Sequence, residues 1–528
     1  MTITILHENG ALPQVYSERV LLSTVLRDAD AASSHTHAHP MCVAMPCGGN
    51  GTCGKCRVYA SGVLSAPSEQ EKVLLGDALS AGERLACMTW AEGDCTIELH
   101  TRKEQVILTD GVLPALPLNP AEEGAVGMAV DIGTTTVAVY AYHLKDGSSL
   151  GRHSFQNPQA KFGADVISRI QAALDGNAAA LRQCIRKELD SAFRRLAKHA
   201  GTPLEQVRSI CVTGNTTMLD LFSGVDVEPL SHSPFEVSEH FGTIHAESQF
   251  PALFRAQVYL PRTISAFVGS DITCALLSSG MVGSAQTILL ADIGTNGEMA
   301  LWHNGRLWCC STAAGPAFEG AGISMGSAAI TGAMSHVETR NGQLHWDTVG
   351  GGNAFSICGS GLIDAVAALL ELGLVDETGR IDEDAPLYEA YGCEREDGPA
   401  LRLGDSGIIL TQPDIRAVQL AKSAICAGMY TLLHEAGASV GQVGSLLLAG
   451  GFGSFLSCAS AGRIGLIPSA LAPAARSIGN AAGMGASMIL LSDEMKARSL
   501  EIAAAAKDVE LSASPYFMEQ YVEQMMFS

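Results

Sequence analysis

Apolar residues along this chain follow two different patterns. In the first hundred residues, short segments such as Thr2–Leu6 alternate with the period of two that half-buried strands show, and Glu8-Asn9-Gly10 is a hairpin turn signal. Further strands are predicted at Arg57–Ala60 and Cys95–Leu99, and short helices at Val20–Leu26 and Glu69–Leu75. This region therefore predicts a small mixed sheet with short helices.

From about residue 125 onward the pattern is α/β in style, because apolar strands alternate with Ala-rich helices. Between the two regions, residues 111–120 contain three prolines, which predict a stiff linker of limited reach. The predicted organisation is a first domain at 1–103, a linker at 104–124, and two α/β subdomains at 125–283 and 284–528.

One short segment of the α/β region occurs twice. The string Ala-Val-Asp-Ile-Gly-Thr-Thr-Thr at 129–136 returns 161 residues later as Leu-Ala-Asp-Ile-Gly-Thr-Asn-Gly at 290–297. Each copy follows an apolar strand. Two matching strand–turn units predict a duplicated domain with a cleft between its halves.

Composition narrows the class of protein. A chain of 528 residues predicts about three or four domains, and 47% hydrophobic with 17% charged residues is typical of a packed globular protein. The net charge of -22 disfavours nucleic acid or an anionic membrane as a partner, because both would repel it. No secretory signal and no run of about 18 apolar residues is found, so we expect a cytoplasmic protein with reduced thiols.

Four of the fifteen cysteines form a pattern with chemical meaning. Cys47, Cys53 and Cys56 have the spacing C-x5-C-x2-C within a Gly-rich loop, and Cys87 follows at a distance. Three thiolates on one tight loop with a fourth from elsewhere in the fold predict an iron–sulfur cluster, and the spacing looks like that of adrenodoxin-type [2Fe-2S] domains. Structural zinc is the alternative, but it usually needs a second C-x2-C pair. Most other cysteines, such as Cys211, lie in apolar runs and are predicted to be buried.

Two other interpretations of this neighbourhood are weaker. Residues 49–55 fit G-x4-G-K, but a Walker A loop requires Ser or Thr next, and Cys56 stands there. Upstream, His35, His37 and His39 could bind a metal, although alternating histidines in a flexible segment fix no geometry and a solvated loop is favoured.

The two Asp-Ile-Gly-Thr turns predict a second chemistry. Asp131 and Asp292 each end a buried strand, where a carboxylate can hold the water shell of Mg²⁺, and the Gly and Thr that follow offer donors to phosphate oxygens. A third strand runs into Gly450-Gly451, which lets the backbone approach the adenosine of a nucleotide closely. The three elements together predict a nucleotide site.

In this order the motifs resemble those of the acetate and sugar kinase/Hsp70/actin superfamily, which has a duplicated RNase H-like fold. Behind a β-grasp [2Fe-2S] ferredoxin-like domain, they resemble the reductive activators of corrinoid proteins. Matching strings extend over nearly the whole chain, among them Gly214–Met218, Ser311–Gly320, Ile357–Asp364 and Ile478–Gly483.

The resemblance implies roles for individual residues. Asp131 and Asp292 are expected to orient Mg²⁺ and its waters, and Glu298 and Glu319 are candidates to orient the attacking water. Contacts to phosphate are expected from Gly133, Thr134, Thr135, Gly294, Thr295 and Asn296, and an adenosine site from Gly450, Gly451 and Gly453.

The implied activity is ATP-dependent reduction of a partner's corrinoid from Co(II) to Co(I), with one electron delivered from the [2Fe-2S] cluster. The implied partners are a corrinoid protein of a methyltransferase system and an external low-potential electron donor, and the sequence is compatible with a homodimer. Two alternatives stay open: a small-molecule kinase with a ferredoxin module, and an ATP-dependent activator of a radical dehydratase.

Overall fold

The computed structural model describes residues 1–7, 10–32, 43, 49, 51, 54, 56–99, 113–245, 256–395, 398–450 and 455–527. The chain divides into two compact units, Met1–Glu104 with Pro158–Asn177, and Gln105–Asn157 with Ala178–Ser528. In the described ranges, no helix combines the length and apolar character needed to cross a bilayer.

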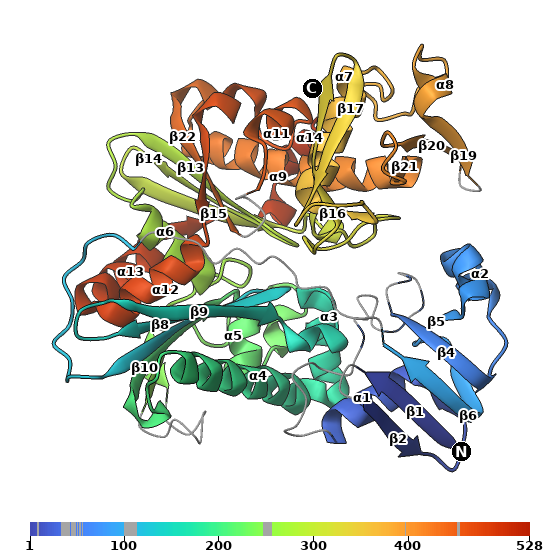
Figure 1. The fold of residues 1–528 in the computed structure, drawn as a ribbon. Coiled ribbons are helices and arrows are strands. Elements are labelled where there is room, and N and C mark those ends of the chain that lie inside the picture. The colour runs from blue at the N-terminus through green and yellow to red at the C-terminus, as the bar shows by residue number, and fades with distance from the viewer. Residues whose placement is uncertain are drawn as a thin grey trace. The chain divides into compact units, whose positions relative to one another are not determined.

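The first unit is built on a mixed sheet, seen in blue in Figure 1. Its order is β2-β1-β6-β4-β5, with β3 also paired to β6, and β1 runs parallel to β6. A core that includes Ile3, Ile5, Val58 and Ile97 lies under this sheet. The elements are β1 (Thr2–His7), β2 (Gly10–Val15), β3 (Val20–Leu21), α1 (Leu22–Ala32), β4 (Arg57–Leu64), α2 (Glu69–Leu75), β5 (Glu83–Leu85), β6 (Trp90–Glu98) and α3 (Val166–Ala172).

The strands predicted in this region and the helix at Glu69–Leu75 are confirmed. The prediction of a helix beginning at Val20 is wrong for its first two residues. Val20 and Leu21 instead pair with Ala91 and Trp90, because strand β6 offers hydrogen-bonding partners there that local spacing cannot reveal.

The second unit contains two sheets with the same plan. In each, a three-stranded antiparallel meander continues into two parallel strands: β9-β8-β7-β10-β12 in the first sheet and β15-β14-β13-β22-β23 in the second. The predicted duplication is therefore confirmed at the level of topology. The first sheet has β7 (Val126–Ile132), β8 (Thr136–His143), β9 (Ser149–Gln156), β10 (Val207–Gly214), β11 (Thr243–His245) and β12 (Gln257–Leu260); the second has β13 (Thr287–Ile293), β14 (Gly297–His303), β15 (Arg306–Thr312), β22 (Val443–Ala449), β23 (Ala475–Gly479) and β24 (Ala506–Asp508).

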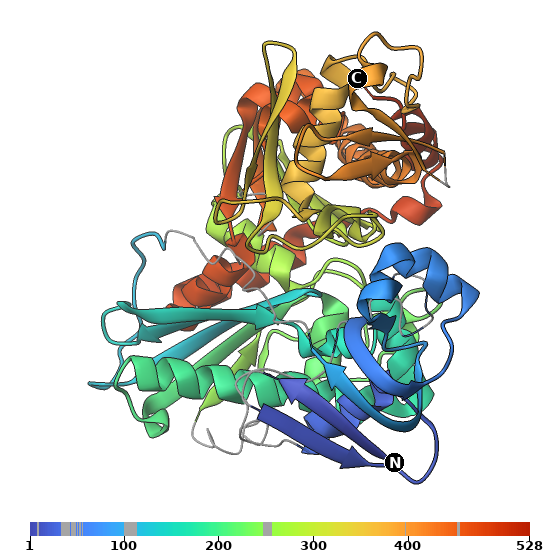
Figure 2. The same cartoon turned by 45° about the vertical axis from the view of Figure 1, so that its right-hand side comes forward.

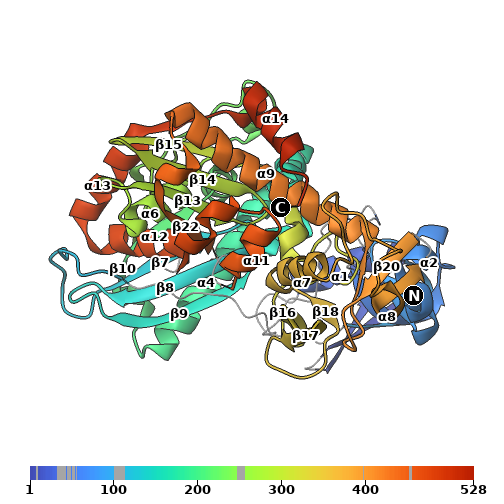
Figure 3. The same ribbon diagram turned by 90° about the horizontal axis from the view of Figure 1, so that it is seen from above.

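Helices fill the space between the two sheets and cover their outer faces. Helices α6 (Ser270–Ser279) and α12 (Ala481–Leu491) share one core with Tyr140 of the first sheet and Leu290 of the second. Helix α4 (Ala178–His199) packs on the other face of the first sheet (Figure 2), and α9 (Gln412–Ala436) packs on the second sheet with α14 (Pro515–Glu523) beside it (Figure 3). Among the described residues the remaining α-helices are α5 (Thr216–Ser223), α7 (Gly359–Glu371), α8 (Tyr388–Tyr391), α11 (Cys458–Arg463) and α13 (Asp493–Ala505).

Two small sheets extend the second half of this unit. One comprises β16 (Ala333–Arg340), β17 (Gln343–Thr348) and β18 (Ser356–Ile357), and the other comprises β19 (Gly392–Arg395), β20 (Gly398–Arg402) and β21 (Ile409–Thr411). The thiols predicted to be core residues are buried, as Cys211, Cys274 and Cys426 show.

Candidate functional site

The two Asp-Ile-Gly-Thr turns occupy equivalent places in the two sheets. Asp131 and Asp292 are the penultimate residues of β7 and β13, and both strands lie between their meander and a parallel strand. The turns close tightly, since Gly133 N–H donates to the Thr136 carbonyl at 2.9 Å and Gly294 N–H to that of Asn296 at 3.0 Å. A Cβ at position 133 would lie 2.6 Å from the Thr136 oxygen, so glycine is needed there.

Carboxyl groups influence one another strongly around these turns. Burial raises the pKa of Asp131 to about 6, with a hydrogen bond from Asn480 acting in the opposite direction. Burial, followed by the charge of Asp131, raises the pKa of Asp292 to about 7. Burial and then the charges of Asp271 and Asp292 raise the pKa of Glu298 well above its ordinary value. Such groups favour a cation, because bound positive charge would relieve the cost of ionising them together.

Asp271 belongs to this group and was not predicted. Burial and then the charge of Asp292 raise its pKa to about 8. It lies in the first turn of α6, and the preceding Gly269 packs so closely that a Cβ there would lie 2.4 Å from Cα of Asn215. A single Asp in an apolar helix start gives no sequence signal; only the fold brings it to the turns.

Two asparagines orient the turns, and sequence reasoning gave neither a role. Asn480 Nδ2 donates to Asp131 Oδ2 at 2.9 Å, and Asn215 Nδ2 donates to Thr134 Oγ1 at 3.0 Å. Each also caps a helix through its side-chain oxygen, α12 for Asn480 and α5 for Asn215. Both lie in sequence strings that resemble the family, and this resemblance is the feature of the sequence that could have pointed to them.

Gly450 lies directly against the second turn. It follows β22, whose Ala449 pairs with Asp292, and a Cβ at Gly450 would lie 2.4 Å from Asp292 Oδ1. Its φ of 86° also favours glycine. Gly451 and Gly453 lie outside the described residues, so their predicted contact with adenosine stays a prediction.

Glu319 connects the two turns. Its Oε2 accepts a hydrogen bond from Thr135 Oγ1 at 2.5 Å, and its Oε1 accepts one from Thr295 Oγ1 at 2.6 Å. One half-buried carboxylate thus contacts a hydroxyl from each half of the duplicated unit. Glu298 is placed differently: it is buried on β14 opposite Asp292, with Ser311 Oγ 3.4 Å from its Oε1.

Two of the four predicted cluster ligands are described, and they converge. The Sγ atoms of Cys56 and Cys87 lie 3.3 Å apart and are buried, a separation too long for a disulfide between them. Gly49, Gly51 and Gly54 all have positive φ, and a Cβ at Gly49 would lie 3.9 Å from Cβ of Cys87. Cys47, Cys53, His35, His37 and His39 lie outside the described residues.

A buried ion pair supports the segment that carries Cys87. Glu71 is fully buried, and its carboxylate accepts hydrogen bonds from the Arg84 guanidinium at 3.0 and 3.1 Å, from Leu85 N–H at 2.8 Å and from Thr89 Oγ1 at 2.9 Å. Burial alone would raise the pKa of Glu71, but these hydrogen bonds outweigh it and lower the pKa. Glu71 therefore fixes both sides of the turn around Cys87.

Within the described residues, no three His, Cys, Asp or Glu side chains are arranged as a ready metal site.

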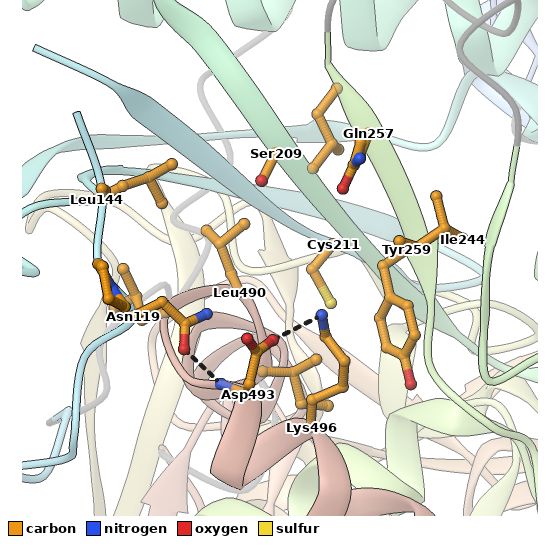
Figure 4. A pocket seen from close by; sticks show the side chains of 15 residues that line it. Asn119, Leu144, Ser209, Cys211, Ile244, Gln257, Tyr259, Leu490, Asp493 and Lys496 are labelled. Carbon is orange, nitrogen blue, oxygen red and sulfur yellow. Dashed lines mark hydrogen bonds and ion pairs between the residues drawn. The ribbon is translucent and has the colours of Figure 1, made fainter.

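A pocket of about 280 Å³ lies elsewhere in the second unit (Figure 4). Its charged groups are paired with each other: Lys496 Nζ lies 3.0 Å from Asp493 Oδ1, and Asp493 N–H donates to Asn119 Oδ1 at 2.8 Å. None of the predicted site residues lines it, so the candidate site is the pair of turns and not this pocket.

The repeated sheet plan with an Asp turn in each half defines an ASKHA-type protein of the sugar kinase and actin class. A model of the C-terminal ASKHA domain of RACo matches residues 286–528, and a model of the RACo middle region matches residues 126–284. The chain belongs to the RACo family, the reductive activators of corrinoid proteins.

Individual relatives agree with this assignment. The chain is 33% identical over 447 residues to the corrinoid activation enzyme RamQ of Eubacterium limosum, covering 82% of this chain and 75% of that protein. It is 25% identical over 377 residues to a Co(II) methylated amine-specific corrinoid protein reductase of Methanosarcina barkeri, covering 65% and 66%. A solved structure of a reductive activator for a corrinoid, iron–sulfur protein superposes with a TM-score of 0.70 at 28% identity, covering 100% of this chain and 98% of that one.

Proposed function

We propose that this protein is an ATP-dependent reductase that returns a corrinoid protein from Co(II) to Co(I), using one electron from a [2Fe-2S] cluster. The observation that carries the proposal is family membership, together with relatives named as a corrinoid activation enzyme and a Co(II) corrinoid protein reductase. The partner is a corrinoid protein, and an external low-potential donor reloads the cluster.

The first unit suits a ferredoxin-like role. Its mixed sheet, with β1 parallel to β6, is compatible with a β-grasp domain at residues 1–103. The buried, converging thiols of Cys56 and Cys87 fit two of the four ligands of a [2Fe-2S] cluster, and Cys47 and Cys53 complete the proposed set. The cluster, when bound, supplies a one-electron carrier.

The two α/β subdomains, proposed at 125–283 and 284–528 after a linker at 104–124, would bind Mg²⁺ and ATP. Asp131 and Asp292 hold the waters of Mg²⁺, with Asp271 and Glu298 adding negative charge nearby. Thr134, Thr135, Thr295 and Asn296 donate to phosphate oxygens, and Gly133 and Gly294 keep the tight turns that bring these donors to the phosphates. Phosphoryl transfer requires mainly positioning and charge neutralisation, so these groups suffice for slow hydrolysis.

Coupling to ATP is needed because the electron moves uphill. A plant-type ferredoxin cluster has a reduction potential of about -400 mV. If the corrinoid couple lies about 100 mV lower, the step costs roughly 2.3 kcal/mol for one electron. A nucleotide-dependent change in partner affinity can provide this, since coupling free energies of about 1–3 kcal/mol are common.

The test is direct. The reduced protein is mixed with a Co(II) corrinoid protein, with and without Mg-ATP, and Co(I) absorbance is followed; we expect Co(I) only with ATP. The variant Cys87→Ser should bind ATP but deliver no electron, whereas loss of both properties would contradict separate modules. No Co(I) with any corrinoid partner, together with phosphorylation of a free metabolite, would instead establish the kinase alternative.

A further inference from the structure

The two hydrogen bonds from Thr135 and Thr295 to Glu319, called here the Glu319 bridge, place an acceptor where the proposed nucleotide site needs one. The bridging hydroxyls come from the two repeated turns and lie 2.5 and 2.6 Å from the carboxylate oxygens. A carboxylate with two oxygens, each accepting one hydroxyl, offers the same kind of acceptor as two phosphate oxygens.

The bridge and a bound phosphate exclude each other. A threonine hydroxyl has a single hydrogen to donate, so Thr135 and Thr295 cannot donate to Glu319 and to a phosphate at once. The Glu319 carboxylate also lies over the second turn, since a Cβ at Gly294 would be 3.8 Å from its Oε1. A phosphate at that turn would meet a like charge, which adds repulsion to the competition.

The backbone around Glu319 is held in place, so opening the bridge requires movement of the Glu319 side chain. Ala317 and Phe318, which precede it, are buried in the core, and a Cβ at Gly320 would lie 2.4 Å from the Ser327 nitrogen. Glu319 ends a short 3₁₀ helix, Pro316–Glu319, that is flanked by Gly315 with φ 83° and Gly320 with φ 76°. On one side Gly315 N–H donates to the Thr295 carbonyl at 3.0 Å; on the other, Ser324 N–H donates to Asp414 Oδ1 at 2.7 Å. Movement of Glu319 is therefore confined to the stretch between these two anchors.

We propose that Glu319 is an internal substitute for a nucleotide phosphate, holding the two turns together in the nucleotide-free protein and leaving them when phosphate binds. This inference rests on the proposed ATP site and adds a regulatory contact to it. The stabilisation that the Glu319 bridge provides is then lost when nucleotide binds, so the affinity for nucleotide is lower than it would be at the same site without the bridge. By linkage, removing the bridge must raise that affinity.

The experiment measures binding of the non-hydrolysable ATP analogue AMPPNP with Mg²⁺ to the full chain by calorimetry. Glu319→Ala should bind about fivefold tighter or more, with Glu319→Gln intermediate because its amide has one acceptor oxygen. Glu389→Ala, at an exposed position on α8, is the matched control and should bind as the wild type does. Unchanged or weaker binding by Glu319→Ala would overturn the proposal, because Glu319 would then support the bound state.

A structure of the wild-type protein with Mg-AMPPNP supplies a readout that does not depend on a variant. The Glu319 carboxylate should then lie beyond hydrogen-bonding distance of Thr135 and Thr295, whereas a bridge that stays closed around bound nucleotide would contradict release of Glu319. If the wild type binds no nucleotide, the proposed function and this inference both fail. If nucleotide binds and the bridge opens without any Co(I) being formed, only the proposed function fails.

Discussion

The hydroxyl of Thr135 donates a hydrogen bond of 2.5 Å to the carboxylate of Glu319, which lies 184 residues further along the chain. This contact, with its counterpart from Thr295, links the two halves of a duplicated unit through a single side chain. Two of the residues that we expect to bind phosphate are thus engaged with a carboxylate in this structure.

A double-mutant cycle should detect this contact in the absence of nucleotide. Thr135→Val and Glu319→Ala should each destabilise the protein, and the double variant should lose less stability than the sum of the two single losses, because each single variant already removes the shared hydrogen bond. A coupling of about 1.5–3 kcal/mol is expected for a hydrogen bond to a charged group. Urea unfolding measures it; Thr135→Ser, which keeps the hydroxyl, is the control, and strict additivity would contradict the contact.

Replacing Asp271 by Asn should weaken binding of Mg-nucleotide while stabilising the nucleotide-free protein at pH 8. The reason is that Asp271 adds a charge to the site of Asp131 and Asp292, which costs free energy until a cation arrives. Calorimetric binding and urea unfolding measure the two effects. Glu205→Gln, at an exposed position, should change neither. If both quantities moved in the same direction, Asp271 would not belong to the cation site.

Glu71→Gln should destabilise the first unit by about 3 kcal/mol or more, because it leaves the buried Arg84 guanidinium without its counter-charge. The visible absorbance of the reconstituted cluster should also be lost at a lower temperature, since Glu71 holds both sides of the Cys87 turn. Glu69→Gln removes an exposed ion pair with Lys72 and should cost less than about 1 kcal/mol. Equal effects of the two variants would argue against a positioning role for Glu71.

Asp220 should make stability depend on pH. Both of its carboxylate oxygens are buried without a hydrogen-bond partner among the described residues, and burial, then the charges of Glu239 and Asp226, raises its pKa to about 8. An acid whose pKa is higher in the folded protein than in the unfolded chain stabilises the fold fully when the pH is below the unfolded pKa, about 3.9 for Asp. This stabilisation is lost as the pH rises through the pKa in the folded protein.

The variant Asp220→Asn cannot ionise, so its stability relative to the wild type should increase from pH 5 to pH 8, by an amount on the order of 1 kcal/mol per pH unit. Urea midpoints at pH 5, 6.5 and 8 measure this difference. Glu205→Gln again serves as the exposed control. A difference that does not vary with pH would show that Asp220 ionises normally.

The local sequence pattern was sufficient to predict much of the fold. The strand at Thr2–Leu6, the helix at Glu69–Leu75 and the equivalence of Asp131 and Asp292 follow from short segments whose spacing or repetition is visible along the chain. The prediction of helix at Val20 and Leu21 is wrong because these residues pair with Ala91 and Trp90, about 70 residues away in sequence. This pairing overrides the local helical spacing.

The sequence by itself determined which chemical groups are present and that the Asp turn occurs twice, because strand periodicity, turn chemistry and cysteine spacing are local properties. Only the tertiary structure decided that Asp271, Asn215 and Asn480 join these turns and that Glu319 connects Thr135 to Thr295. The physical reason is that such contacts form where strand pairing and helix packing bring distant segments together. A single Asp, Asn or Glu has no periodicity that reveals its partner.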